Sequence, residues 1–222
     1  MRQLNFAYFT KVRMPINLNL SVIKAIKSDE LKDLSKEFSE IAIDSFFDEG
    51  ILREIPIVGT IIGLLKAGGA VRDNIFANKI ASFLNRLASI SSQERLKLVD
   101  RLNENESYKN RVGDVIIEIL DRVESEKKPD LIARVFIAFA KEEITFLELQ
   151  RLVIAIERLP IFELQMVREL HDRSIEQLLL MDKASLTMLT MAGLARSDGG
   201  FDGGIEIPTE LCKTFIRLNL DK

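Results

Sequence analysis

Very few side chains in this sequence are suited to covalent or metal chemistry. Among 222 residues there is a single histidine, His171, and a single cysteine, Cys212. A zinc site made of His and Cys ligands needs several of them, so one chain cannot assemble it. The lone cysteine excludes an internal disulfide and is typical of proteins from a reducing compartment. We therefore expect no metal site of this kind.

A catalytic triad or a Cys–His dyad would have to use His171. This residue lies within the run LHDRS (170–174), which carries no nucleophile signature. Catalytic histidines are recognised by the groups that surround them and by the roles of those groups. We interpret His171 as a structural or surface residue.

Motifs that bind phosphate or calcium are incomplete. The run GTIIGLLK (59–66) places a lysine near two glycines, but a phosphate-binding loop needs G-x-x-x-x-G-K-[ST] after a strand. The run EEITFLELQRL (142–152) is similar to the exit helix of an EF-hand, yet no calcium loop precedes it. Carboxylates cluster at 142–143 and along 114–121, on expected helix faces where solvated charge is ordinary. We predict that the chain is not an enzyme and binds no cofactor; a deep polar cleft holding several carboxylates would reopen that question.

The segment 55–71 is the most apolar in the chain, and the other elements are expected to pack around it. Its sequence, IPIVGTIIGLLKAGGAV, holds four of the eleven glycines and one charge, Lys66. Gly59 and Gly63 have the small-xxx-small spacing that lets two helices approach closely. Two interpretations stay open. The segment is either a core helix covered on every side by its own chain, or a stretch that dips into or spans a membrane.

Membrane contact would draw on the cations that flank or interrupt this segment. Seventeen residues with a lysine among them are borderline for crossing a bilayer, so we favour the core helix. Six residues carry the two interpretations, three for close packing or exposure and three for contact with anions: Gly59, Gly63 and Lys66, and Arg72, Lys79 and Arg86.

Charge is nearly balanced overall but uneven along the chain. The net charge is −3; residues 1–111 hold 17 basic against 14 acidic residues, and residues 112–222 hold 14 against 20, or +3 against −6. This balance predicts no strong field for nucleic acid or anionic lipid. The sequence carries no secretory signal and no charge-free apolar run of about 18 residues. We expect a cytoplasmic protein, with peripheral attachment to the inner membrane as the alternative.

Apolar residues recur at helical spacing through most of the chain. Capping boxes at Ser91/Glu94 and Thr145/Glu148 predict two helix starts. Further helices are expected over 72–87, 111–126, 130–140, 161–180 and 182–192. The charged segment ESEKKPD separates an N-terminal helical region, 1–126, from a C-terminal region, 127–222, and we expect both to pack as one unit.

The C-terminal tail has a different pattern. Strand-like runs flank a glycine-rich tip after Ala192, and Thr209 opens a last helix. This is the order of the wing in a winged helix-turn-helix domain, but residues 160–222 hold 7 basic against 10 acidic residues, and binding to phosphates needs the opposite balance. The predicted fold is therefore mainly α, a multi-helix domain with a small, wing-like C-terminal β-hairpin followed by a last helix.

Two sets of packing motifs resemble small, mostly helical bacterial proteins of unassigned function. The first set is the run IPIVG from Ile55, with Arg72-Asp73, Phe76, Lys79 and Phe83-Leu84. The second set is Ala192-Gly193-Leu194 with Thr209-Glu210-Leu211. The resemblance implies a bacterial, mostly helical fold and supplies no catalytic residues. Some such proteins are suspected of roles in phage defence or abortive infection.

Together these features predict a non-enzymatic bacterial interaction protein, built around an apolar helix that is buried or released toward a partner. A protein partner or self-association is expected, with no cofactor. The first alternative is a membrane-associated or membrane-inserting effector that acts in defence or arrests growth, for which an anionic membrane is the partner. The second is a winged-helix DNA-binding regulator, although the charge disfavours nucleic acid as a partner.

Overall fold

The computed structural model describes residues 17–32, 71–199 and 204–222, with the main chain alone at 17 and at 71–74. The predicted central helix over 55–71 lies outside this range, apart from the main chain of Val71. Its placement therefore stays a prediction. Among the described residues, no helix combines the length and the apolar character that crossing a membrane requires.

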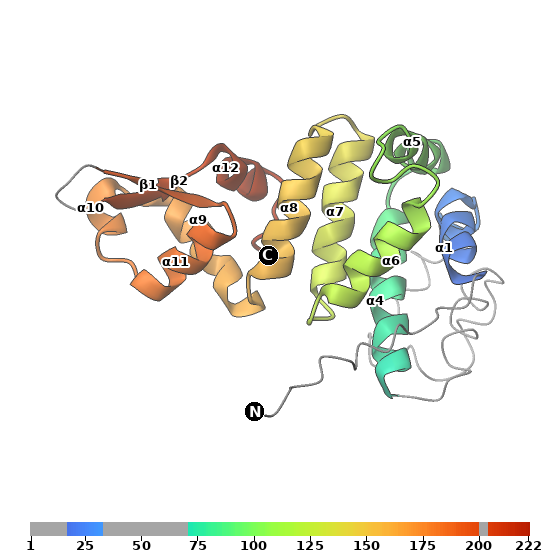
Figure 1. Ribbon diagram of the computed structural model, residues 1–222, viewed down its shortest axis with the longest axis horizontal. Coiled ribbons are helices and arrows are strands. Elements are labelled where there is room, and N and C mark those ends of the chain that lie inside the picture. The colour runs from blue at the N-terminus through green and yellow to red at the C-terminus, as the bar shows by residue number, and fades with distance from the viewer. Residues whose placement is uncertain (1–16, 33–70, 200–203) are drawn as a thin grey trace, which may run out of the picture.

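The first part of the described chain is a bundle of helices. Their bounds are α1 (Asn17–Lys27), α4 (Val71–Leu87), α5 (Ser92–Asn103), α6 (Val112–Arg122), α7 (Lys128–Ala140) and α8 (Phe146–Arg158). α7 packs against α4, α5 and α8, and α1 packs on α5 and α6 (Figure 1). Ten of the thirteen α7 residues are buried. Within the described chain, α7 is thus a helix covered on nearly every side by its neighbours.

Both predicted capping boxes are confirmed. At the start of α5, Ser91 Oγ accepts the Glu94 backbone N–H at 3.2 Å, and the Glu94 carboxylate accepts the Ser91 N–H at 2.8 Å. Thr145 and Glu148 make the same reciprocal pair at the start of α8, at 3.2 and 2.8 Å. Each box satisfies two donors that the first helical turn leaves without partners.

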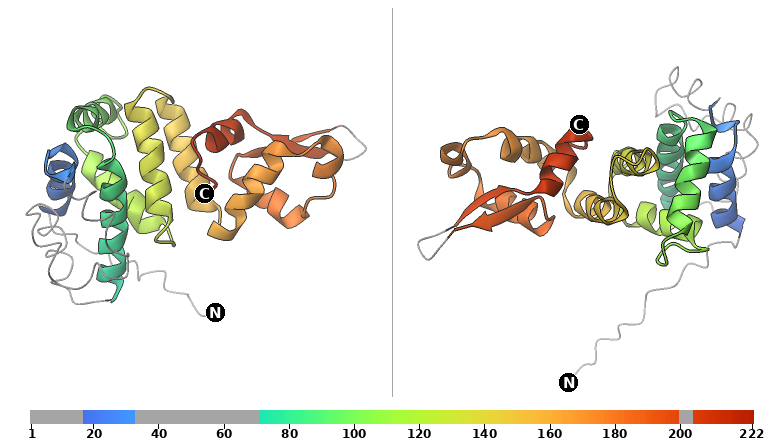
Figure 2. Two further views of the ribbon diagram at one scale, coloured as in Figure 1. Left: turned by 180° about the vertical axis from the view of Figure 1, so that it is seen from behind. Right: turned by 90° about the horizontal axis from the view of Figure 1, so that it is seen from above.

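The second part of the chain carries short helices and a hairpin. It comprises η3 (Ile161–Glu163), α9 (Leu164–Asp172), α10 (Ile175–Leu178), α11 (Lys183–Met191), β1 (Ala195–Asp198), β2 (Ile205–Pro208) and α12 (Glu210–Arg217). The strands are antiparallel, with Ala195 opposite Pro208 and Asp198 opposite Ile205. α12 packs on α8 and α9, so the last helix joins the hairpin to the helical bundle (Figure 2).

The predicted fold class is confirmed: the protein is mainly helical, with a two-stranded antiparallel hairpin followed by a final helix. The single long helix predicted over 161–180 is wrong. The chain there forms η3, α9 and α10, because Arg173 and Ser174 adopt extended backbone with ψ of 147° and 164°. Ser174 and Gln177 form a capping box that starts α10. Arg173 is thus the C-cap of α9, and Ser174 is the N-cap of α10. The division at residues 126 and 127 stays a prediction.

Candidate interaction surfaces

The most reactive side chains that the sequence offers are those of Cys212 and His171. Cys212 is buried, its Sγ lies 3.8 Å from the Val167 carbonyl oxygen, and burial raises the pKa of the thiol to about 12. A thiol with this pKa is almost entirely protonated at neutral pH and is a poor nucleophile. His171 Nδ1 lies 2.6 Å from Asp172 Oδ1 on a solvent-facing part of α9. Across the described ranges, no group of three or more His, Cys, Asp or Glu residues is placed to hold a metal ion.

The residues predicted from the sequence to contact partners or membrane are only partly within the described chain. Gly59, Gly63 and Lys66 lie outside it, and Arg72 is described by its main chain alone, in the first turn of α4. The remaining two lie further along α4. The structure does not bring the six together as one described site.

Lys79 and Arg86 both point into contacts with the bundle. The Lys79 side chain is buried, and its Nζ donates to the Val123 carbonyl at 2.5 Å. Arg86 pairs with Asp130, which also accepts from Arg134 at 2.9 Å. In this structure, contact between Lys79 and an anionic surface would first require the helix packing around it to open.

Arg86 also belongs to a basic cluster around a cavity of ≈ 300 Å³. Its other cations are Arg134, Lys141 and Arg217. Arg86, Lys141 and Arg217 lie at or just beyond the C-terminal ends of α4, α7 and α12, where helix dipoles favour positive charge. Arg217 donates to the Glu143 carbonyl at 3.4 Å and Arg134 to the Asn219 carbonyl at 2.7 Å. The cluster therefore has a structural explanation, and we do not assign it as an anion site.

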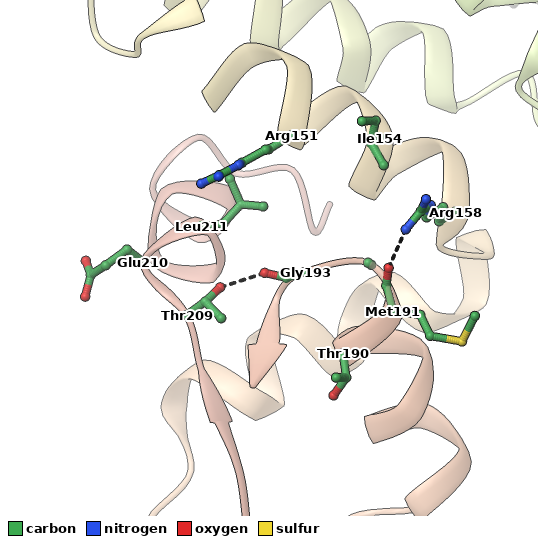
Figure 3. Close-up of a pocket in the computed structure, with 10 residues that line it drawn as sticks. Arg151, Ile154, Arg158, Thr190, Met191, Gly193, Thr209, Glu210 and Leu211 are labelled. Carbon is green, nitrogen blue, oxygen red and sulfur yellow. Dashed lines mark hydrogen bonds between the residues drawn. The ribbon is translucent and has the colours of Figure 1, made fainter. Parts of the chain in front are cut away.

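A groove lies between α8, the end of α11 and the start of α12 (Figure 3). Its volume is ≈ 430 Å³, and α8 lines it with Arg151, Ile154 and Arg158. The opposite wall consists of residues 190–193 and 209–211. Arg158 Nη1 donates to the Met191 carbonyl at 2.8 Å, and this bond ties α8 to the end of α11 across the groove.

Local sequence explains why the chain turns at this point. Gly193 has φ of +78°, and the Leu194 N–H donates to the Leu189 carbonyl at 2.9 Å, so α11 ends in a left-handed C-cap. Thr209 Oγ1 then accepts the Cys212 N–H at 3.2 Å and donates to the Gly193 carbonyl at 2.9 Å. One threonine thus caps α12 and fixes it to the turn that follows α11.

The groove exposes apolar and cationic side chains together. Ile154 is 43% exposed and Met191 is 67% exposed. Arg151 makes no ion pair or side-chain hydrogen bond with any described residue, and Arg158 has no carboxylate partner among them. The one acid of the lining, Glu210, bonds to Lys213 at 2.6 Å. The groove therefore presents two guanidinium groups whose charge no described carboxylate neutralises.

A second surface surrounds α10 and consists of Ile175, Leu179 and Leu180; we name it the α10 surface. These side chains are 65%, 66% and 84% exposed, whereas Leu178 between them is buried. The Leu179 N–H donates to the Ile175 carbonyl, so these two residues lie one turn apart on the same side. Adjacent apolar side chains left in water are typical of interaction surfaces in soluble proteins.

The sequence reasoning missed both surfaces. The run Leu178–Leu180 falls within the long helix predicted over 161–180, and that prediction carries no sign of its exposure. The α8 face was visible only as a 4–3–4 spacing of Leu147, Arg151, Ile154 and Arg158, and Leu147 and Ile154 fit a buried stripe equally well. In the structure both side chains are exposed, so they belong to an open face of α8 and not to a buried stripe.

In comparisons with known proteins, no family model, no curated protein and no solved structure matches this chain.

Proposed function

We propose that this protein is a non-enzymatic interaction protein whose winged-helix-like C-terminal part joins a second copy of the chain through the α10 surface. The observation that carries the proposal is the exposure of Ile175, Leu179 and Leu180 side by side. A surface made of apolar side chains can pack against its own copy across a two-fold axis. Burying it removes apolar area from water, which is the main driving force of association.

The charge of the helix and hairpin supports a protein partner over DNA. A winged-helix DNA reader needs cations on the helix that enters the groove and on the wing. Here the exposed side chains of α11 are Lys183, Ala184, Thr187, Thr190 and Met191. On the hairpin, Arg196 lies 3.8 Å from Asp198, so its charge is already compensated.

Charge also weighs against an anionic membrane as the partner of the α10 surface. Peripheral segments usually combine apolar side chains with several lysines or arginines. Next to α10 the nearest arginine in the sequence, Arg173, pairs with Glu169, and the helix itself carries Glu176. The membrane alternative for residues 55–71 stays a prediction, and flotation of the full chain with anionic vesicles tests it separately.

Sedimentation velocity over a concentration series tests the proposed self-association. We expect the full chain to sediment as a dimer that dissociates on dilution, and Leu179→Glu to shift it to the monomer. Leu20→Glu is the matched control, because Leu20 is exposed to a similar extent, 59% against 66%, but lies on α1. Circular dichroism confirms that each variant is folded.

A wild-type chain that stays monomeric at every concentration would contradict the proposal. So would equal effects of Leu179→Glu and Leu20→Glu, since the association would then not depend on the α10 surface.

A further inference from the structure

The groove of Figure 3 supports an inference that is independent of the α10 surface and concerns a different partner. We propose that the groove, together with the exposed face of α8, binds an amphipathic helix that carries acidic residues beside its apolar stripe. Three observations lead to this partner: the spacing of side chains on α8, the uncompensated charge and the apolar lining.

The exposed face of α8 alternates apolar and cationic residues at regular helical spacing. Leu147 and Ile154 are seven residues apart, and so are Arg151 and Arg158. Seven residues correspond to about 10.5 Å along a helix. Helices that pack at a shallow angle meet repeatedly at this interval, as in coiled coils. A partner helix lying along α8 would meet an apolar residue and then a cation, twice in succession.

The side chains on this face are free to meet a partner. Leu147 is 54% exposed and Ile154 is 43% exposed, although α8 buries its opposite face in the bundle. Met191 and Leu211 extend the apolar lining across the groove from α11 and α12. Apolar side chains that surround a groove of this kind supply contact area, and the partner must present an apolar stripe to match it.

The positive charge of the groove favours a partner that carries negative charge. Arg151 has no ion-pair or hydrogen-bond partner in the described part of the chain, and Arg158 donates only to a carbonyl there. Carboxylates placed opposite two guanidinium groups gain charge-assisted, bidentate hydrogen bonds. Complementary charge of this kind sets orientation and specificity more than it sets affinity. An acidic helix is therefore favoured over a neutral or basic one.

Nucleic acid fits the same groove less well. Binding to a phosphate backbone draws its affinity from many cations, each of which releases counterions. The groove offers two arginines and the carboxylate of Glu210, and Ile154, Met191 and Leu211 also line it. Apolar side chains in these positions contribute nothing to a phosphate contact, whereas they match the apolar stripe of a helix.

Fluorescence anisotropy with the full chain tests the proposal. The probe is a labelled, stapled helical peptide of about four turns, with leucine along one stripe and glutamate beside it at heptad spacing. A matched peptide replaces every glutamate with lysine. We expect the acidic peptide to bind and the basic peptide to bind at least about tenfold more weakly.

Two pairs of variants locate the contact. Arg151→Glu should weaken binding of the acidic peptide by about tenfold or more. Its control is Lys97→Glu, which makes the same charge change on the exposed face of α5 and should leave binding of the acidic peptide unchanged. Ile154→Asp should weaken binding as well, and Leu96→Asp is its control, because the two side chains are 43% and 40% exposed. Arg151→Glu should also gain affinity for the basic peptide, which a misfolded variant could not do.

Several outcomes would overturn the proposal. Equal loss with Arg151→Glu and Lys97→Glu would show that charge acts over the whole surface and not in the groove. No binding of the acidic peptide, or tighter binding of a labelled DNA duplex that Arg151→Glu abolishes, would remove the acidic helix as the partner. Dissociation of a dimer by Arg151→Glu, but not by Leu179→Glu, would assign the groove to self-association and contradict both proposals.

Discussion

Arg95 is a fully buried charge, and its replacement is the sharpest test of how the bundle is held together. The side chain extends from α5, and its guanidinium donates three hydrogen bonds to backbone carbonyls. The acceptors are Ile26 at 2.8 Å, Ser28 at 2.6 Å and Ile90 at 2.6 Å. The first two carbonyls lie at the C-terminal end of α1, where four carbonyls lack helical partners and the dipole favours a cation.

We expect Arg95→Met to lower the free energy of unfolding by about 3 kcal/mol. Hydrogen bonds from a charged donor contribute about 1.5–3 kcal/mol each, so three of them would give more if they were additive. Part of this is offset, because methionine relieves the cost of burying a charge. That cost is also the reason the pKa of Arg95 lies below its usual value. Methionine fills much of the volume, so the cavity term stays small.

Urea unfolding followed by circular dichroism measures the loss, and Lys97→Met on the exposed face of the same helix is the control. The control should change the free energy of unfolding by less than about 0.5 kcal/mol. Amide hydrogen exchange should show α1 losing protection first, because two of the three lost bonds hold its last turn and the residue just after it. A loss below about 1 kcal/mol, or equal losses in both variants, would refute the view that Arg95 anchors α1.

Three further predictions concern single positions. Gly113→Ala should destabilise the protein by about 1–3 kcal/mol in the same assay, because a Cβ there would lie 2.6 Å from the Asn19 carbonyl oxygen and force α1 away from α6. Cys212 should react with iodoacetamide at pH 8 only after denaturant is added, since its thiol pKa is about 12 in the folded chain; rapid labelling without denaturant would contradict this. Hydrogen bonds from Thr145 hold the pKa of Glu148 below its usual value, so the stabilising effect of this carboxylate is present at neutral pH and is lost in acid, as the carboxylate takes up a proton. The difference in unfolding free energy between wild type and Glu148→Gln should accordingly shrink between pH 6 and pH 3, and a constant difference would rule out the capping carboxylate as its source.

The features that could be predicted from the sequence are local ones. The capping boxes at Ser91 and Thr145 are confirmed. They could be predicted because a capping box depends only on two residues three positions apart. The hairpin and the last helix are also confirmed. They could be predicted because local turn and cap residues mark their ends. The break at Ser174 is also local, but apolar residues continue at helical spacing through it, and this periodicity is a stronger signal than the S-x-x-Q motif.

The contacts that fix the tertiary structure could not be predicted in this way. Arg95 donates hydrogen bonds to three backbone carbonyls, and two of these lie 67 and 69 residues away in the sequence. In the sequence alone, an arginine in RLKLVDRL is one more charge on an amphipathic helix. Gly113 is likewise an ordinary helical glycine until α1 is placed against it. Both positions depend on distant backbone, which neither propensity nor periodicity describes.

The two candidate surfaces depend on this tertiary framework to different degrees. The α10 surface consists of neighbours in sequence, on and just after a short helix that packs against β2. The groove needs α8, α11 and α12 at fixed separations, which the Arg158–Met191 and Thr209–Gly193 hydrogen bonds provide. Loosening α12 should therefore impair binding in the groove before it affects the α10 surface. The two surfaces are separable for this physical reason, although they lie in the same small part of the chain.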